Sequence, residues 1–194
     1  MIDAKSLAII LAAGASRRMG TPKALLELNG QTFLEACVSA FHQATVPSLV
    51  VVGADAELIE AKHRSLNFVR NPDWPSGQLS SVRTGLRAAL AQGARQIFVH
   101  PVDAPRVLPS TIAMLLATLR HGASVVVPAH DAKVGHPLGL TGLVARGVLS
   151  SDAPTLWDYV AGLHPKHVKV KDPGAFDNVN QPEEYRRLLE EKPR

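Results

Sequence analysis

The chain has 194 residues, 46% apolar and 20% charged, and its 21 lysines and arginines against 17 acids give a formal net charge of 21 − 17 = +4. This composition is typical of a globular protein, and no apolar run approaches the roughly 20 residues that a membrane span requires. The whole excess of charge lies between Ala4 and Leu26, where four cations and no acid occur. Proteins that bind nucleic acids or membrane surfaces spread their cations over a face or an arm, so neither partner is expected.

The N-terminus does not resemble a signal peptide, because Asp3 occupies a place where such peptides carry positive charge. The single cysteine, Cys37, lies among apolar positions of a predicted helix, so we expect it in the core. One cysteine allows no internal disulfide, which agrees with a reducing compartment. The sequence therefore predicts a cytoplasmic protein, and its length suits a single domain covering residues 1–194.

Short runs rich in β-branched residues alternate with helical patterns along the chain. The predicted strands cover Ser6–Leu11, Ser48–Val52, Asn67–Arg70, Gln96–His100, Ala123–Pro128 and His167–Lys171. The predicted helices cover Thr32–Ala44, Ala56–Arg64, Leu79–Gln92, Pro109–Arg120, Pro154–Leu163 and Pro182–Glu191. The first, second, fourth and fifth strands are nearly continuous apolar runs, as expected of parallel strands covered on both faces. This pattern predicts an α/β fold with a doubly wound, mostly parallel sheet and helices on both faces, in which ligands bind beyond the carboxyl ends of the strands.

A loop with the sequence LAAGASRRMGTPK, residues 11–23, begins where the first predicted strand ends. Its small residues let the backbone approach a ligand closely, while Arg17, Arg18 and Lys23 supply positive charge, so we interpret it as a phosphate cradle. The alternative is a flexible Gly/Ala loop with solvated cations. A Walker A loop and a GxGxxG motif are both absent from it, which argues against P-loop NTPases and simple dinucleotide oxidoreductases.

Two serines, Ser80 and Ser81, stand near the start of the helix that follows the third strand. They fit helix N-caps, and they also fit an anion site at a helix N-terminus. Trp74, just upstream, is either a stacking residue or a core residue. This segment therefore has two interpretations at the sequence level.

Three further polar residues follow later strands. Asp103 lies after the fourth strand, between Pro101 and Pro105, where a fixed carboxylate facing a phosphate cradle would suit Mg²⁺. His136 follows the fifth strand and is either a phosphate ligand or a turn residue. Asn180 precedes a proline and two glutamates, a pattern that also signals the start of a helix.

The loop LAAGASRRMGTPK resembles the signature LAAGxSxRMGxxK of the nucleotidyltransferases related to molybdenum cofactor biosynthesis, which include cytidylyltransferases and guanylyltransferases. Segments around residues 71–81, 101–105, 135–137 and 177–184 resemble further motifs of that family. The resemblance implies a Rossmann-like sheet of the nucleotide-diphospho-sugar transferase type. It also implies that the chain is an enzyme.

The resemblance assigns roles to residues of this chain. Arg18, Lys23 and Asp103 would be catalytic, and the second metal ligand would be Asn180, a neutral residue, so that the metal has one carboxylate fewer. The implied nucleotide contacts are Leu11, Ala12, Ala13, Gly14, Arg18, Lys23, Ser80 and Ser81; the implied metal ligands are Asp103 and Asn180; the implied acceptor contact is His136.

The implied reaction transfers CMP from CTP to a phosphorylated acceptor such as molybdopterin, with Mg²⁺ as cofactor and release of pyrophosphate. The Ala12-Ala13 pair resembles the cytidylyltransferase branch, since guanylyltransferases more often carry glycine there. Molybdoenzymes under maturation are the protein partners that the resemblance implies. The alternatives are guanylyl transfer, another acceptor such as a sugar phosphate, an NAD(P)-binding oxidoreductase on the same fold, and a catalytically idle nucleotide-binding module.

Overall fold

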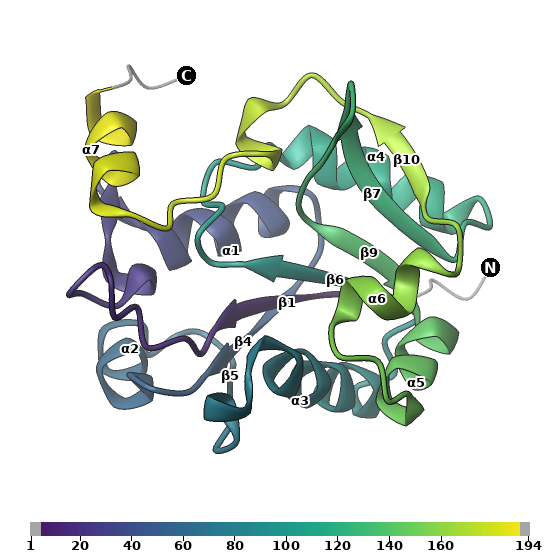
Figure 1. Cartoon of the computed structure of the whole chain (residues 1–194), viewed down its shortest axis with the longest axis horizontal. Coiled ribbons are helices and arrows are strands. Elements are labelled where there is room, and N and C mark those ends of the chain that lie inside the picture. The colour runs from purple at the N-terminus through teal and green to yellow at the C-terminus, as the bar shows by residue number, and fades with distance from the viewer. Residues whose placement is uncertain (1–4, 191–194) are drawn as a thin grey trace.

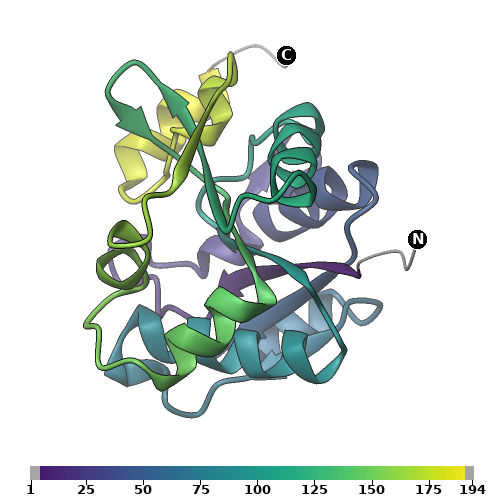
Figure 2. The same ribbon diagram turned by 90° about the vertical axis from the view of Figure 1, so that its right-hand side faces the viewer.

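The computed structural model describes residues 5–190, in which helices cover both faces of an eight-stranded sheet (Figures 1 and 2). The strands of this sheet are β1 (Ser6–Ala12), β4 (Ser48–Val52), β5 (Phe68–Arg70), β6 (Gln96–Pro101), β7 (Val125–His130), β8 (Lys133–Val134), β9 (Leu138–Thr141) and β10 (Lys166–Lys169). The helices are α1 (Phe33–Gln43), α2 (Ala56–Lys62), α3 (Gln78–Ala91), α4 (Pro109–Arg120), α5 (Gly142–Ser150), α6 (Leu156–Ala161) and α7 (Pro182–Glu190). A separate hairpin consists of β2 (Glu27–Leu28) and β3 (Gln31–Thr32), and short 3₁₀ turns are η1 (Lys23–Leu25), η2 (Trp74–Ser76) and η3 (Pro173–Ala175).

Strand β1 lies at the centre of the molecule, and all seven of its residues are buried. Successive side chains of a strand point to opposite faces, so β1 contributes to two cores. Ala8 and Ile10 belong to the core formed with α1 and α4, whereas Leu7 and Ile9 belong to the core formed with α3 and α5. Figure 1 shows these two helix pairs on opposite sides of the sheet. The predicted α/β fold with helices on both faces is confirmed.

The strands of the sheet are arranged in the order β10-β7-β9-β6-β1-β4-β5, and the path of the chain across the sheet changes direction at β1. The chain runs outward from β1 through β4 to β5, then crosses to β6 on the other side of β1, and these strands pair in parallel. In open α/β sheets a ligand crevice forms where neighbouring strands continue to opposite sides. The carboxyl ends of β1 and β6 are therefore the place where a site is expected.

Four strands and one α-helix are missing from the sequence-based prediction: the two-residue strands β2, β3 and β8, the longer strand β9, and α5. Strand β9 pairs antiparallel with both β6 and β7, and α5 follows it directly. Gly139 lies in the middle of β9, where a Cβ atom would come within 2.7 Å of Val126 and 2.8 Å of Phe98. Close packing between the strands thus requires a glycine at this position, and a glycine weakens the strand pattern in the sequence.

The remaining predicted elements are present, with ends that shift by a few residues. Pro109–Arg120 and Ser48–Val52 match the prediction at both ends, and the fifth predicted strand starts two residues later, at Val125. Cys37 is fully buried in α1, as expected. Within residues 5–190, none of the helices combines the length and apolar character needed to cross a bilayer.

Candidate active site

A cavity of about 530 Å³ lies at the carboxyl ends of β1 and β6, where the strand order reverses. This volume falls in the range of about 300 to 1,000 Å³ that small-molecule sites occupy. The sequence-predicted residues that line it are Leu11, Ala12, Ala13, Gly14, Arg18, Lys23, Ser81, Asp103 and Asn180. Ser80 and His136 are not among its lining residues. The fold thus brings nine of the eleven predicted residues to one cavity.

The loop after β1 folds back on itself through Ser16. Ser16 adopts a positive φ of 46°, its carbonyl accepts a hydrogen bond from Met19 N–H at 2.8 Å, and its Oγ accepts one from Lys23 N–H at 3.0 Å. These bonds return the chain to the end of β1, so that η1 starts at Lys23 beside the cavity. The exposed Arg17 and Arg18 remain on the loop and also line the cavity. Three of the four cations between Ala4 and Leu26 therefore surround one concave site.

Lys23 joins two segments that lie far away in the sequence. Its Nζ atom donates hydrogen bonds to Asp103 Oδ2 at 2.8 Å and to Asn180 Oδ1 at 2.7 Å. The side chains of the Lys23–Asp103 ion pair are only 15% and 18% exposed. Partial burial strengthens the attraction between the charges compared with an exposed pair. A cation already lies between the two oxygens that the sequence proposes as metal ligands.

The loop that carries Asp103 is held from several sides. Val102 N–H donates to Leu11 O at 3.1 Å, which joins the ends of β6 and β1, and Cys37 Sγ contacts the carbonyl oxygens of Val102 and Ala104 at 3.8 and 4.0 Å. Burial raises the pKa of the Cys37 thiol, with a further contribution from the Asp103 carboxylate. Cys37 therefore remains a thiol that supports this loop.

His100 supports the same loop from inside the sheet, a role that the sequence-based prediction did not include. It is fully buried, and its Nε2 lies 3.0 Å from Ala104 O, an acceptor, so Nε2 carries the proton. Nδ1 is buried without a hydrogen-bond partner in residues 5–190. Burial, assisted by the nearby His136, lowers the pKa of His100 to about 3. The ring is therefore neutral at physiological pH.

His136 lies behind this loop and does not line the cavity. Its ring makes an edge contact with the ring of His100, with centroids 6.4 Å apart, and its backbone N–H donates to Ala175 O at 2.7 Å. Burial lowers the pKa of His136, while the Asp103 carboxylate acts in the opposite direction. Its predicted role in acceptor binding stays a prediction.

Asn71 organises the loop between β5 and α3, and the sequence-based prediction did not include this residue. It is 2% exposed, and its Nδ2 donates to Ser80 Oγ at 2.8 Å and to Ser81 Oγ at 2.9 Å. Helix α3 starts at Gln78 with Gly77 as its N-cap, so the interpretation of the serines as N-caps is wrong. Ser81 is among the residues that line the cavity, whereas the hydroxyl of Ser80 donates within the loop to Asp73 O and Gly77 O.

Trp74 lies between the cavity and the core. It is among the residues that line the cavity and packs against the core of β1, α3 and α5, whereas a stacking role stays a prediction. Gly53, after β4, comes so close that a Cβ atom there would lie 2.7 Å from Trp74 Cβ and 2.7 Å from Ala13 O. At position 53, only a glycine fits between Trp74 and the backbone of the loop after β1.

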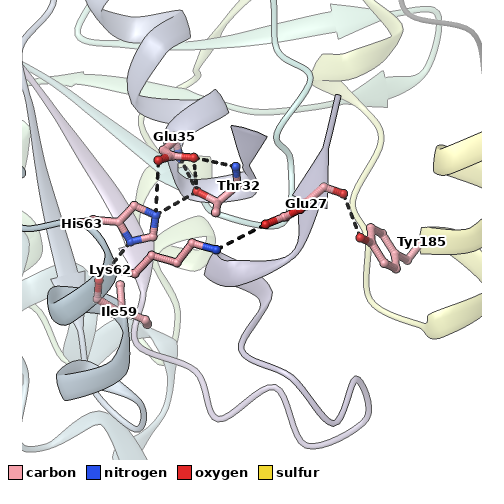
Figure 3. A network of polar contacts seen from close by, with 7 residues as sticks. All are labelled: Glu27, Thr32, Glu35, Ile59, Lys62, His63 and Tyr185. Atoms are coloured by element: carbon pink, nitrogen blue, oxygen red, sulfur yellow. Dashed lines mark hydrogen bonds and ion pairs between the residues drawn. The ribbon is translucent and has the colours of Figure 1, made fainter. Parts of the chain in front are cut away.

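Another wall of the cavity is tied to the β2–β3 hairpin (Figure 3). Ile59 of α2 lines the cavity, and its carbonyl lies 3.0 Å from Nδ1 of the buried His63. On the other side of that ring, Nε2 lies 2.9 Å from Thr32 Oγ1, and Thr32 caps α1 in a reciprocal capping box with Glu35. This network therefore fixes α2 relative to the hairpin and α1.

Asp103 and Asn180 carry the hard oxygens that a divalent cation takes, and one oxygen of each is hydrogen-bonded to Lys23 Nζ. Asp103 Oδ1 is buried and has no hydrogen-bond partner in the described part of the chain, so one carboxylate oxygen is available to a cation. No group of three or more His, Cys, Asp or Glu side chains suited to a metal occurs in residues 5–190. Mg²⁺ commonly takes only one or two protein oxygens and completes its coordination with substrate phosphates and water. The donor set matches that mode.

Comparisons with known proteins agree with this site. The family model of the MobA-like NTP transferase domain matches residues 8–158. A molybdenum cofactor guanylyltransferase from Xanthomonas euvesicatoria is 32% identical over 192 residues, with 95% of each chain covered. A solved nucleotidyl transferase from Methanothermobacter is 27% identical and has a TM-score of 0.81, with 95% of this chain and 96% of that chain covered.

A second solved structure concerns the metal. Rv0371C from Mycobacterium tuberculosis, solved in complex with manganese, is 26% identical and has a TM-score of 0.78, with 97% of this chain and all of that chain covered. The family model extends from β1 into α6 and so includes most of the cavity. The chain therefore belongs to the MobA-like NTP transferase family and is a nucleotidyltransferase.

Proposed function

We propose that this nucleotidyltransferase transfers CMP from CTP to a phosphorylated acceptor such as molybdopterin and releases pyrophosphate. The observation that carries the proposal is the meeting of Lys23, Asp103 and Asn180 in a cavity whose rim is the cationic loop after β1. A triphosphate is bound by cations and backbone N–H groups, and Mg²⁺ is bound by hard oxygens. The cationic residues of the loop and the oxygen-bearing residues Asp103 and Asn180 all line the same cavity.

The proposed reaction is an in-line displacement. An oxygen of the acceptor phosphate attacks the α-phosphorus of CTP, and the bond from that phosphorus to the oxygen bridging to the β-phosphate breaks, so that pyrophosphate leaves. The attacking phosphate is already ionised, so no general base is required and the protein contributes positioning and charge neutralisation. Arg18 and Lys23 are suited to balance the charge that accumulates on the leaving pyrophosphate. Bound Mg²⁺, held by Asp103 and Asn180, would supply Lewis-acid stabilisation of the phosphate oxygens.

The choice of CTP rests on Ala12 and Ala13, which are among the residues that line the cavity and are 5% and 4% exposed. Their side chains belong to the two cores on opposite faces of the sheet, so the preference is argued from resemblance and not from the space that they leave. An alanine pair at these positions resembles the cytidylyltransferase branch, since guanylyltransferases more often carry glycine there. Guanylyl transfer from GTP is the second candidate, because the Xanthomonas relative is named as a guanylyltransferase.

A pyrophosphate-release assay tests the proposal. CTP, GTP and UTP are each supplied with Mg²⁺ and either molybdopterin or a sugar phosphate, and we expect the fastest release with CTP and molybdopterin. Faster release with GTP than with CTP would show that GTP is the donor. Faster release with the sugar phosphate than with molybdopterin would show that the sugar phosphate is the acceptor. NAD(P) binding without pyrophosphate release, or NTP binding without turnover, would refute nucleotidyl transfer as the activity of this site.

A further inference from the structure

Two segments distant in sequence run side by side behind the metal-ligand candidates. We call residues 101–111 the Asp103 segment and residues 172–180 the Asn180 segment. Val179 N–H donates to the backbone carbonyl of Asp103 at 2.8 Å, directly beside the point where the two side chains converge on Lys23. The position of Asn180 is thus set by how these segments are joined.

The first joint is buried. Asp172 is 3% exposed, and its Oδ2 accepts hydrogen bonds from Leu108 N–H at 2.9 Å and from Thr111 Oγ1–H at 2.7 Å. Leu108 is the N-cap of α4 and has no side chain able to cap a helix. Asp172 therefore provides the missing acceptor for this helix start from the other segment.

The second joint is a charged one nearer to the site. Arg106 Nη2 donates to Asp177 Oδ2 at 2.6 Å. Beside it, Gly174 packs so closely that a Cβ atom would lie 2.0 Å from Arg106 O. The side chains of Arg106 and Asp177 are 18% and 45% exposed, so this ion pair lies at the surface and is expected to stabilise the fold little.

On the other side of Asn180, α7 holds the backbone. Glu184 Oε2 accepts hydrogen bonds from Asn180 N–H at 2.6 Å and from Gln181 N–H at 2.9 Å. These bonds lower the pKa of Glu184. Asn180 is thereby held from both directions, by α7 on its C-terminal side and by the Asp177–Arg106 pair on its N-terminal side.

We propose that Arg106 and Asp177 are positioning residues that hold the amide oxygen of Asn180 opposite Asp103 for metal binding. This inference rests on the proposed function, because it assigns the cation to Asp103 and Asn180. The Asp177 carboxylate is oriented to Arg106, so it acts through the backbone. A neutral amide ligand binds a cation more weakly than a carboxylate does, which makes its placement by neighbouring groups more important.

Substituting Arg106 separates positioning from simple electrostatics. Removing a positive charge near a cation site should tighten metal binding if charge alone matters. If Arg106 positions Asn180, the Arg106→Gln variant should bind the metal more weakly. The Asp177→Asn variant should also bind it more weakly, and we expect a loss of about 10-fold for each, as for other groups that orient metal ligands.

The experiment measures Mn²⁺ binding to the full chain by electron paramagnetic resonance, with the metal alone and no nucleotide or acceptor. The matched control is Glu183→Gln, which removes the same charge as Asp177→Asn at the same sequence distance from Asn180 and lies in an exposed pair with Arg186. We expect the control to bind Mn²⁺ like the parent chain. The double variant with both substitutions should lose no more affinity than either single one, because the two residues form one unit.

Three outcomes would overturn the inference: tighter Mn²⁺ binding by Arg106→Gln, unchanged binding by Asp177→Asn, or an equal loss in the Glu183→Gln control. Melting temperatures of Arg106→Gln and Asp177→Asn close to that of the parent chain would show that the effect is local. In the pyrophosphate assay, the metal concentration that gives the half-maximal rate should rise by a larger factor in these variants than kcat falls. If the parent chain binds Mn²⁺ but releases no pyrophosphate from any NTP, the proposed reaction fails while the binding comparison still tests the two positioning residues.

Discussion

Acidification should destabilise this protein through His100, a residue whose neutral form the fold requires. Its ring is buried beneath the Asp103 loop and donates from Nε2 to Ala104 O. Burial lowers its pKa from 6.5 to about 3. Between these two values the unfolded chain binds a proton that the folded chain does not, so the free energy of unfolding falls as the pH falls.

The size of the effect follows from the two pKa values. Where the unfolded chain binds one proton more than the folded chain, the free energy of unfolding changes by about 1.4 kcal/mol per pH unit. Between pH 7 and pH 4.5, a pKa of 6.5 in the unfolded chain and about 3 in the folded chain give a loss of about 2 to 3 kcal/mol from His100. This is a large part of the roughly 5 to 15 kcal/mol that keeps a typical domain folded.

Urea unfolding at a series of pH values between 4.5 and 7 measures this loss, and the His100→Gln variant provides the comparison. Glutamine retains an N–H donor for Ala104 O but does not titrate, whereas the other acids and histidines titrate in both chains. We expect the parent chain to lose about 2 kcal/mol more than the variant over this range. Equal pH dependence in the two chains would show that His100 accepts its proton without cost, which would refute the inference from its burial.

Three further predictions concern catalysis, helix capping and the cavity wall. Lys23→Ala and Asp103→Ala should each lower kcat in the pyrophosphate assay by at least about 10²-fold, because each removes a charge at the reacting phosphates; Lys166→Ala, on the exposed strand β10, should leave kcat unchanged. Thr32→Ala should lower the free energy of unfolding by about 2 to 4 kcal/mol in urea titrations, since it removes the side-chain cap of α1 and the hydrogen-bond partner of the buried His63. Gly53→Ala should weaken nucleotide binding in calorimetry, because its methyl group would lie 2.7 Å from Ala13 O; unaltered affinity would show that the loop yields to the methyl group.

The fold could be predicted where one local pattern determines the structure. The apolar run in β1 is long and continuous because the strand is covered on both faces, so its burial is visible in the sequence. Strand β9 follows from no such run. It is short, its central Gly139 is imposed by Val126 and Phe98 from neighbouring strands, and its antiparallel direction depends on pairing with β6 and β7.

The same distinction applies to the site. Lys23, Asp103 and Asn180 each lie in a recognisable motif, so the sequence predicted them as site residues, but it did not indicate that one ammonium group contacts both oxygens. Asn71 and His100 were missed because their roles exist only through contacts with other segments. A buried asparagine beside a proline and a histidine at a strand end look like turn and strand residues until the fold is known.

The two oxygens of the proposed metal site are supported in different ways, and this difference determines where the site can vary. Asp103 belongs to a loop fixed by the core, with Leu11, Cys37 and His100 contacting its backbone neighbours. Asn180 belongs to a segment whose Ala175 and Val179 also lie in the core, but whose half-exposed Asp177 is tied to Arg106 and whose Asn180 N–H is tied to α7. A substitution beneath Asp103 therefore disturbs the core and changes stability, whereas one at the Asp177–Arg106 pair can shift metal affinity while the core stays intact. Metal affinity in this chain should accordingly be tuned from the Asn180 side.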